Sequence, residues 1–295
     1  MNLFNKKKLL VTHSGTFHAD DIFATATLSI LLKGNINVVR TRDKATFTKA
    51  DFLYDVGGEH DPALNHFDHH QPGGAGVRAN GVPYAAFGLV WQKFGPELCG
   101  SAEVAALVDA KIVQPVDAND NGIDTFSIKD PGGLYVIQNL IYAYRPTWKE
   151  DPDYDKAFMQ CVEIARGVLA REIKRAQDLH EATNLLESLY QGTADKRVVM
   201  LDAQYPWKDF MLAKPEPLYV VSQKDGMWRA ECVLKERYSF ENRKSFPIAW
   251  AGLREAELES ASGVKGAMFC HNGRFLVVAQ TREAILALVQ KALLE

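Results

Sequence analysis

The first half of the chain alternates short apolar runs with apolar residues at helical spacing. Short apolar runs bounded by polar turns predict buried strands, and apolar residues that recur every three or four positions predict helices packed on them. Because the two patterns follow one another in turn, we expect a mainly parallel sheet with right-handed crossovers and flanking helices. The expected strands lie at 9–11, 36–42 and 52–55, and the expected helices begin at Ala19, Pro83 and Ala102. The helix from Pro83 is expected to end at Gly95-Pro96.

The second half changes its pattern twice. From about 155 to 190 the apolar positions keep a helical period without a proline, which predicts long helices. These helices would either connect two domains or form a hairpin that covers the first domain. Beyond 195, Asp225-Gly226 and Asn272-Gly273 are typical of hairpin turns between strands. Strand patterns at 198–201, 217–234 and 266–280 alternate with helical patterns at 205–212, 249–260 and 281–294.

These patterns predict an α/β protein with two sheets. The length of 295 residues suggests about two domains. We expect an N-terminal catalytic domain over 1–150, a helical connector over 151–194, and a smaller substrate-binding domain over 195–295. The last of these should be built on a mostly antiparallel sheet, because its strands are joined by tight turns.

Side chains that can bind a metal follow the expected strands of the first domain. Because the carboxyl ends of parallel strands meet at one edge of a sheet, these side chains should lie close together. Crowded imidazoles and carboxylates would repel or lack partners unless a cation lies between them. The alternative, that each histidine is an ordinary surface or core residue, does not explain why five of the eight histidines lie in two short loops. The candidates are His13, His18, Asp20, Asp21, Asp55, Asp68, His69 and His70.

A further acidic stretch, QPVDANDNGID at 114–124, contains Asp117, Asp120 and Asp124. Taken alone, its Asn-Gly and Asp-rich composition indicates a solvated turn. Taken with the histidine loops, it is expected to supply the last metal ligand. The spacing does not separate Asp117 from Asp120.

The donor set limits the metal and the chemistry. Histidine and carboxylate ligands without thiolate suit manganese, magnesium, cobalt or zinc, and the mixture of nitrogen and hard oxygen favours manganese. About two histidines and one shared aspartate per ion suggest a pair of divalent metals. Two ions roughly 3.5–4 Å apart can activate a water molecule and neutralise a transferring phosphoryl group.

Composition excludes several other classes. The four cysteines form no Cys-x-x-Cys pair, so cysteine-based zinc sites and dithiol redox sites are excluded. The N-terminus has too few apolar residues for a signal peptide, and no apolar stretch is long enough to span a membrane. Together with the dispersed cysteines, this predicts a cytoplasmic protein without a membrane partner. The net charge of −3 makes the whole chain a poor polyanion binder. The isolated cysteines are Cys99, Cys161, Cys232 and Cys270.

The last third carries cationic side chains that could face a cleft, although a solvated surface position is the simpler interpretation for each. Candidates for holding the phosphates beyond the scissile one are His271, Arg254, Arg243 and Lys244, with His271 expected nearest the chemistry. Four aromatic residues are interleaved with the cations, which fits an oligonucleotide better than a small phosphate, although such spacing is also typical of a core. These aromatic residues are Tyr238, Phe240, Phe246 and Trp250.

The motif Asp68-His69-His70, with Asp55 before it, resembles the DHH phosphoesterase superfamily. That superfamily includes single-strand exonucleases, oligoribonucleases, cyclic-dinucleotide phosphodiesterases and family II inorganic pyrophosphatases. Its usual first motif, His-x3-Asp-x-Asp, has the form His13-x4-His18-x-Asp20 in this chain.

With this variant, nearly the whole chain resembles the melanocyte-proliferating-gene family. Its proteins were long called metal-dependent protein hydrolases, and a eukaryotic member is described as a 3′–5′ RNA exonuclease. The matching motifs are Thr12-His13, Asp55-Val-Gly-Gly58, Val116-Asp-Ala-x-Asp-Asn-Gly122, Pro146-Thr-Trp148, Tyr205-Pro-Trp-Lys208 and Ser262-Gly-Val-x-Gly-Ala-x-Phe-x-His271.

The resemblance implies roles for the candidate residues. His13 and His18 would bind one metal, and Asp55 would bridge the pair. The second metal would be held by Asp20, His69 and one of Asp117 and Asp120. His70 would contact the scissile phosphate, and Asp21 and Asp68 would orient the ligands from behind.

The leading hypothesis is therefore a two-metal phosphodiesterase of the manganese type, a 3′–5′ exonuclease acting on RNA or short oligonucleotides. A small-phosphate hydrolase, such as a family II-like inorganic pyrophosphatase, is the alternative enzyme. A metal-stabilised binding protein without turnover is the alternative of another class, and the complete catalytic set argues against it. The sequence leaves the oligomeric state open.

Overall fold

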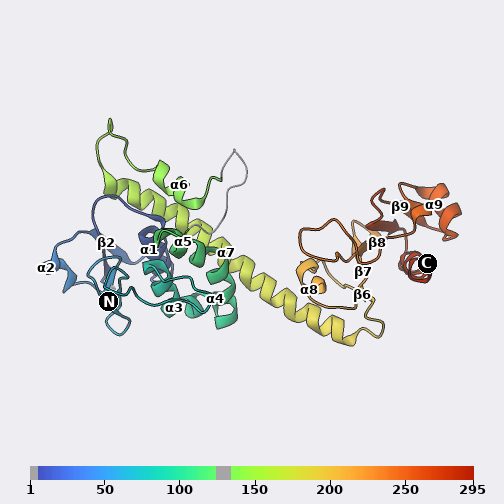
Figure 1. Ribbon diagram of the computed structural model, residues 1–295, viewed down its shortest axis with the longest axis horizontal. Coiled ribbons are helices and arrows are strands. Elements are labelled where there is room, and N and C mark those ends of the chain that lie inside the picture. Colours follow the sequence, from blue (N-terminus) through green and yellow to red (C-terminus); the bar gives the residue numbers. More distant parts are fainter. Residues whose placement is uncertain (1–5, 124–133) are drawn as a thin grey trace, which may run out of the picture. The chain divides into compact units, whose positions relative to one another are not determined.

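A computed structural model describes residues 6–123 and 134–295 of the chain. The chain divides into two compact units, Met1–Gln177 and Asp178–Glu295, and each unit has its own five-stranded sheet (Figure 1). The helices expected between 155 and 190 form one continuous helix, α7 (Tyr154–Gly192), and the boundary between the units falls inside it. The division into 1–150, 151–194 and 195–295 stays a prediction.

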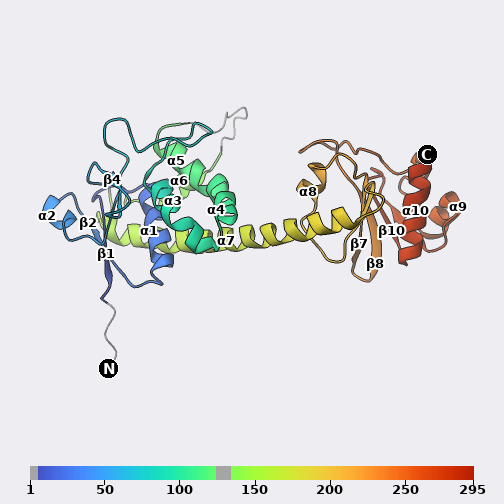
Figure 2. The same cartoon turned by 90° about the horizontal axis from the view of Figure 1, so that it is seen from below.

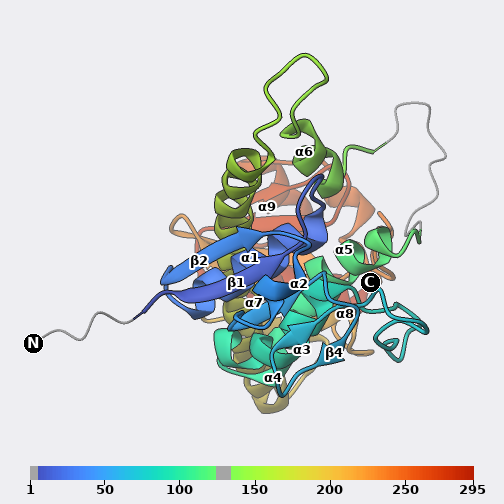
Figure 3. The same ribbon diagram turned by 90° about the vertical axis from the view of Figure 1, so that its left-hand side faces the viewer.

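The sheet of the first unit is mainly parallel, as predicted. Its strand order is β2-β1-β3-β5-β4, and β4 alone pairs in the antiparallel direction, at the edge. β1 and β2 lie side by side in Figure 3. The strands are β1 (Lys8–Thr12), β2 (Ile36–Arg40), β3 (Phe52–Tyr54), β4 (His60–Asp61) and β5 (His66–Phe67). β4 and β5 were not expected, because two-residue strands are too short to show a period.

Helices pack on this sheet around a core of aromatic and aliphatic side chains. Phe23 of α1 meets Phe87 of α3 with ring centroids 5.3 Å apart. The first half of α7 covers the same core, where Phe158 is fully buried against Phe17. The helices are α1 (Ala19–Leu31), α2 (Lys44–Phe47), α3 (Ala86–Cys99), α4 (Ala102–Val108), the π-helix η1 (Asp109–Val113), α5 (Gln114–Asp120) and α6 (Ile137–Ala143).

Two expectations about these helices are wrong. α3 does not end at Gly95-Pro96 but runs on to Cys99, with Pro96 inside it. Because proline has no amide hydrogen, the helix loses the hydrogen bond to the carbonyl four residues earlier, which is that of Gln92. Gln92 is exposed, so water can donate to this carbonyl instead. The chain then turns at Gly100, which has a left-handed backbone.

The stretch at 114–120 is helical rather than a turn. α4, η1 and α5 follow one another without a break, and Pro115 lies in the first turn of α5, where a helix tolerates it. Asp117 and Asp120 therefore lie one turn apart on one helix. Asp124 lies outside the described residues.

The second unit has the mostly antiparallel sheet that was predicted. Its strand order is β6-β7-β8-β10-β9, and only β6 and β7 run parallel. Asp225-Gly226 forms the tight turn between β7 and β8, with positive φ at both residues. The helix expected at 249–260 begins only at Glu255, after Gly252 with its positive φ. The strands are β6 (Val198–Met200), β7 (Tyr219–Lys224), β8 (Met227–Cys232), β9 (Ala267–Cys270) and β10 (Leu276–Ala279).

Helices close the core of the second unit, and α10 lies beside the sheet (Figure 2). Its Ile285 and Leu288 side chains are fully buried in that core. These helices are α8 (Lys208–Leu212), the 3-10 helix η2 (Ile248–Trp250), α9 (Glu255–Ser262) and α10 (Arg282–Leu294). All four cysteines are free and buried. Among residues 6–123 and 134–295, no helix combines the length and the apolarity that crossing a membrane requires.

Candidate metal centre

The predicted ligands converge at the carboxyl ends of three neighbouring parallel strands. His13 follows β1, Asp55 follows β3, and Asp68, His69 and His70 follow β5. Because β1, β3 and β5 are adjacent and parallel, the residues after them emerge at the same edge of the sheet. The first turn of α1 and the last turn of α5 bring further carboxylates to this edge, as the distances below show.

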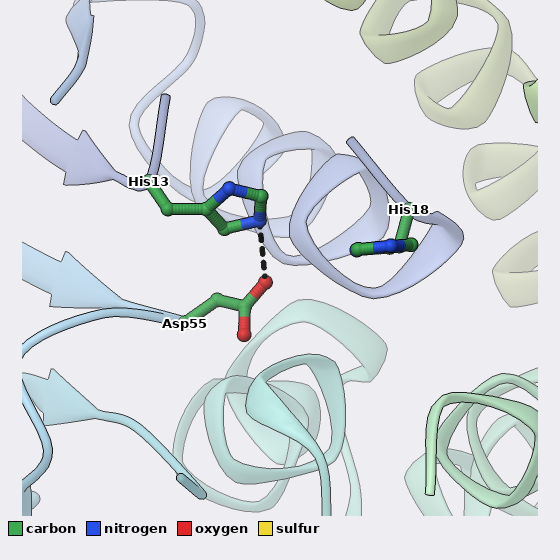
Figure 4. A group of neighbouring side chains, drawn as sticks. All are labelled: His13, His18 and Asp55. Carbon is green, nitrogen blue, oxygen red and sulfur yellow. Dashed lines mark ion pairs between the residues drawn. The ribbon is translucent and has the colours of Figure 1, made fainter. Parts of the chain in front are cut away.

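His13, His18 and Asp55 form the first ligand group, in which one candidate ligand atom of each residue lies within 4.8 Å of the others. In Figure 4 the His13 ring points to the Asp55 carboxylate, and His18 lies at the start of α1. The distance from His13 Nε2 to Asp55 Oδ2 is 3.2 Å. Two imidazoles and a carboxylate at this spacing can share one cation.

Asp20, His69 and Asp120 form the second ligand group, by the same measure. His69 Nε2 lies 3.2 Å from Asp120 Oδ2 and 3.4 Å from Asp55 Oδ1. Asp55 therefore turns one oxygen toward His13 of the first group and the other toward His69 of the second. A carboxylate in this position can serve both ligand groups.

The backbone at Asp55 has a left-handed conformation, with φ of 55°. Aspartate tolerates this region better than most residues, but the conformation is uncommon and often marks a functional position. The Asp55 amide donates to the Phe67 carbonyl of β5, which holds the strained residue at the end of β3.

The charges of the cluster demand a cation. Asp20, Asp21 and Asp55 are all buried. Burial first, and then the negative charges of Asp120 and Asp55, raise the pKa of Asp20 well above its usual value. Within the described residues, Asp21 Oδ2 and Asp55 Oδ1 are buried without a hydrogen-bond partner. Buried carboxylate oxygens of this kind are what a divalent ion would satisfy, so the residues fit a metal.

The pKa values of His13 and His69 also indicate that the cluster requires positive charge. Burial opposes protonation of His13, but Asp21 and Asp55 outweigh it and raise the pKa of His13 to about 10. For His69, Asp120 and Asp55 likewise outweigh burial and raise the pKa to about 11. Either protonated imidazoles or metal ions can supply the positive charge, and a metal must displace those protons to bind the ring nitrogens.

Asp20 is held by the start of α3. Its Oδ2 accepts from the Ala86 amide at 3.0 Å, and its Oδ1 accepts from the Phe87 amide at 2.6 Å. The first amides of a helix have no partner within the helix and carry partial positive charge. α3 therefore orients the Asp20 carboxylate and leaves one lone pair on each oxygen for the ligand group.

Asp117 and Asp120 have different surroundings. Asp117 Oδ2 lies 2.8 Å from Arg78 Nη1, and its Oδ1 accepts from the Gly88 amide at 3.0 Å. A Cβ added at Gly88 would lie 1.8 Å from Asp117 Oδ2, so this contact requires glycine. Arg78 also donates to both oxygens of Asp109. Asp117 is thus paired within the protein, whereas Asp120 lies in the second ligand group.

Asp68 organises the loop that carries His69 and His70. Its Oδ1 accepts from both of their amides and from His70 Nδ1, and its Oδ2 accepts from the Gly58 amide. The His70 side chain remains 61% exposed, and its Nε2 is left for a ligand in the cavity. Asp21 accepts from the His18 amide and lies 3.3 Å from His13 Nε2, so it contacts residues of the first group.

A cavity of about 520 Å³ opens over these residues. Ligand residues of both groups face it, together with His70 and Asp68. Its other walls are Thr16, Arg42, Val56, Gly57, Gly58, Asn119 and Tyr142. Sequence reasoning missed Arg42 and Tyr142, since each is a single residue without a motif around it.

A family model named for the MYG1 exonucleases and described as "Uncharacterised protein family (UPF0160)" matches residues 9–293. The chain belongs to this family. The resemblance to the melanocyte-proliferating-gene proteins that the motifs indicated is therefore confirmed.

Curated relatives match the MYG1-family chain over almost its full length. The human protein named MYG1 exonuclease is 30% identical over 320 residues, covering 96% of this chain and 85% of its own. A MYG1 protein of Schizosaccharomyces pombe is 26% identical and covers 96% and 97% of the two chains. A crystal structure of RecJ with Mn²⁺ from Thermus thermophilus is similar at 15% identity and a TM-score of 0.29; this chain spans 51% of that chain, and the match covers 97% of this one.

The four predicted substrate-binding residues of the MYG1-family chain lie in the second unit. Arg243 donates to three main-chain carbonyls of the segment 212–217, so its guanidinium is used within the unit. Lys244 Nζ lies 3.4 Å from the Leu293 carbonyl, and Arg254 lies over the Phe269 ring. His271 accepts from the Gly273 amide through Nδ1. Their role in substrate binding stays a prediction.

The interleaved aromatic residues of the second unit separate into two kinds. Phe246 and Trp250 are buried in its core, so they are not available for stacking on a base. Tyr238 and Phe240 are almost fully exposed. A pattern of aromatic and basic residues does not tell these kinds apart, because burial depends on the fold around them.

Proposed function

We propose that this MYG1-family protein is a phosphodiesterase that depends on two divalent metal ions and removes nucleotides from the 3′ end of RNA or short oligonucleotides. The observation that carries the proposal is the position of Asp55, with one oxygen toward His13 and the other toward His69. Relatives named MYG1 exonuclease in human, rat and mouse support the nucleic-acid substrate.

The residues divide between two ions. His13, His18 and Asp55 would hold one ion, and Asp20, His69 and Asp120 the other, with Asp55 shared. We assign Asp120 rather than Asp117, because Asp117 is already paired with Arg78. The mixed histidine and carboxylate set favours manganese. When bound, such a pair supplies an activated water and neutralises charge on the phosphoryl group.

The chain's own residues would orient the reaction. Asp68 fixes His70 through Nδ1, so that Nε2 can donate a proton or a hydrogen bond to a phosphate oxygen in the cavity. The hydrogen bond that His70 Nδ1 makes to the Asp68 carboxylate raises the pKa of His70, which favours the protonated, donating form. Asp21 would fix the approach of His13 and His18.

The cavity fits a nucleotide better than pyrophosphate. Around a small, multiply charged anion a pyrophosphatase requires several close cations. Of the described residues that line this cavity, Arg42 is the one lysine or arginine, and Tyr142 offers an aromatic wall. Substrate binding by the second unit through His271 and Arg254, and a cytoplasmic location, stay predictions.

A substrate panel tests the proposal. The purified chain loaded with Mn²⁺ is mixed with RNA or DNA labelled at the 5′ end, and separately with pyrophosphate, with a chelator as the control. We expect RNA to shorten one nucleotide at a time from the 3′ end, and shortening to stop with the chelator. Faster turnover of pyrophosphate than of any oligonucleotide would contradict the proposal.

A further inference from the structure

Aromatic side chains are exposed in the last turn of α6 and on the segment that follows it. Tyr142 is 40% exposed and Trp148 is 89% exposed. Tyr142 borders the candidate cavity, and aromatic side chains are enriched at binding surfaces. Figure 3 shows α6 and the loop that follows it beyond the end of β1.

Tyr142 lies directly at the candidate metal centre. It lines the cavity that His13, Asp55 and Asp120 face. Its ring lies edge-on to the His18 ring, with centroids 6.4 Å apart and an angle of 77° between the planes. A nucleotide whose phosphate lies at the ligand groups therefore has this ring beside its sugar and base.

Tyr142 is also held in place before any ligand binds. The Arg145 guanidinium lies 3.9 Å from the centre of its ring. Arg145 in turn donates to the Phe17 carbonyl, in the loop just before His18. A ring fixed in this way loses little conformational entropy when it contacts a base, which favours binding. The contact with Arg145 occupies one face of the ring, and the residue as a whole remains 40% exposed.

Cations accompany these rings. Arg42 lines the same cavity. Farther along the chain, Lys149 Nζ lies 4.9 Å from the centre of the Trp148 ring. Trp148 is six residues after Tyr142, a stretch that spans at most roughly 20 Å of extended chain, so it can contact a strand that leaves the cavity. Alternating aromatic rings and cations is the usual arrangement for binding single-stranded nucleic acid.

We propose that Tyr142 is the platform on which the 3′-terminal base of a single strand stacks, and that Trp148 is a second platform for a base farther along the strand. This inference rests on the proposed nuclease function and adds the chemical part of the substrate that is recognised. Stacking does not depend on which base is present, so the site would bind without a strong sequence preference.

The test compares Tyr142→Ala with Tyr142→Phe, using RNA with an ordinary or an abasic 3′ end. Tyr142→Ala should raise KM for ordinary RNA roughly ten- to hundredfold, the loss expected when one stacking ring is removed. Tyr142→Phe should retain the wild-type KM. On the abasic end, wild type and Tyr142→Ala should have the same KM, because no base is left to stack.

Two further variants sharpen the test. Tyr144→Ala is the matched control, because Tyr144 is equally exposed, at 40%, follows the same helix and does not line the cavity. It should leave KM unchanged. Trp148→Ala should weaken binding of an oligonucleotide of about ten bases and leave a dinucleotide unaffected, since only the longer strand reaches it.

Direct binding separates this inference from the proposed function. Fluorescence anisotropy with labelled single-stranded RNA, in Ca²⁺ to suppress cleavage, measures affinity for each variant, and bound Mn²⁺ is counted in each. RNA that binds in a Tyr142-dependent way without being cleaved in Mn²⁺ would overturn the nuclease and keep the stacking site. Cleavage that is equally efficient in wild type and Tyr142→Ala on the ordinary end would overturn the stacking site alone. Failure to bind RNA at all would overturn both.

Discussion

The first unit contains two acidic clusters whose negative charge is compensated in different ways. In one, Asp117 and Asp109 both pair with Arg78, and burial outweighs the arginine enough to raise the pKa of Asp117 to about 7. In the other, Asp20, Asp21 and Asp55 lie with histidines and no arginine or lysine makes an ion pair with them among the described residues. Since burying a carboxylate without a counter-charge is costly, the second cluster depends on protonated histidines or on a bound cation for its positive charge.

The same contrast separates a structural aspartate from a candidate ligand on one helix. Asp117 and Asp120 are three residues apart on α5, yet one faces an arginine and an amide while the other faces His69. The cation supplied by the chain identifies the structural residue, and its absence identifies the candidate ligand.

The largest expected effect is on activity, from Asp55→Asn. The amide keeps the size of the side chain but removes the charge shared by both ligand groups, so we expect the rate to fall by about a thousandfold or more, as for removal of an essential catalytic group. Cleavage of labelled RNA measures it. Asp61→Asn, the same change in the edge strand β4, is the control. An Asp55→Asn protein with near wild-type activity would contradict a shared role for Asp55.

The next effect is on stability, from Arg78→Met. Removing one partner of a buried ion pair leaves uncompensated charge, and such changes cost about 3–5 kcal/mol. Urea unfolding measures it. Arg78→Lys should recover part of the loss, because lysine keeps the charge but not the fork that bonds Asp109. If Arg78→Met instead unfolds like wild type, the paired cluster does not stabilise the unit.

Two variants of α5 compare the aspartate of each cluster under the same conditions. Asp120→Asn should reduce bound metal and lower the urea midpoint of the metal-free protein less than Asp117→Asn does, because Asp120 is the less buried of the two. Asp117→Asn should lower that midpoint and leave at least one metal site intact. Metal analysis and unfolding on both variants decide the matter, and exchanged phenotypes would reverse the assignment of ligand and structural residue.

A smaller effect is the release of protons from the histidines when the metal-free protein binds Mn²⁺. The pKa of His13 is raised to about 10 and that of His69 to about 11, so both rings are protonated in the metal-free protein near neutral pH. Binding of Mn²⁺ should then release at least about two protons per chain, one from each ring. Calorimetry in buffers of different ionisation enthalpy counts them. Release of no protons would show that the histidines do not bind the metal.

The same shifts predict the sign of the pH dependence. A histidine whose folded-state pKa lies above its unfolded value of about 6.5 stabilises the folded state fully below that value. This contribution is lost as the pH rises through about 10 to 11. The metal-free protein should thus lose stability as the pH rises from about 6.5 to about 11. The apparent affinity for metal should rise over the same pH range.

The sequence was sufficient for the parts of the site that follow from strand order. His13, Asp55 and Asp68-His69-His70 could be placed together because residues after adjacent parallel strands share an edge. The two mixed sheets and their directions were also predictable from run lengths and turn residues.

The remaining parts depend on contacts between distant segments. The amides that hold Asp20 come from α3, 66 and 67 residues along the chain, and no local pattern signals them. Asp117 could not be separated from Asp120 because its partner Arg78 lies in a loop without periodicity. The helix at 114–120 was missed because Asp-Asn-Gly composition favours turns, and packing against α1 and α3 overrides that preference.

Counting bound Mn²⁺ ions by electron paramagnetic resonance tests whether Asp55 joins two metal sites. Titration of the metal-free protein should show two ions per chain with the spin coupling of ions held close together, and Asp55→Asn should abolish the coupling. A single ion per chain, or two ions without coupling in the wild type, would contradict the account.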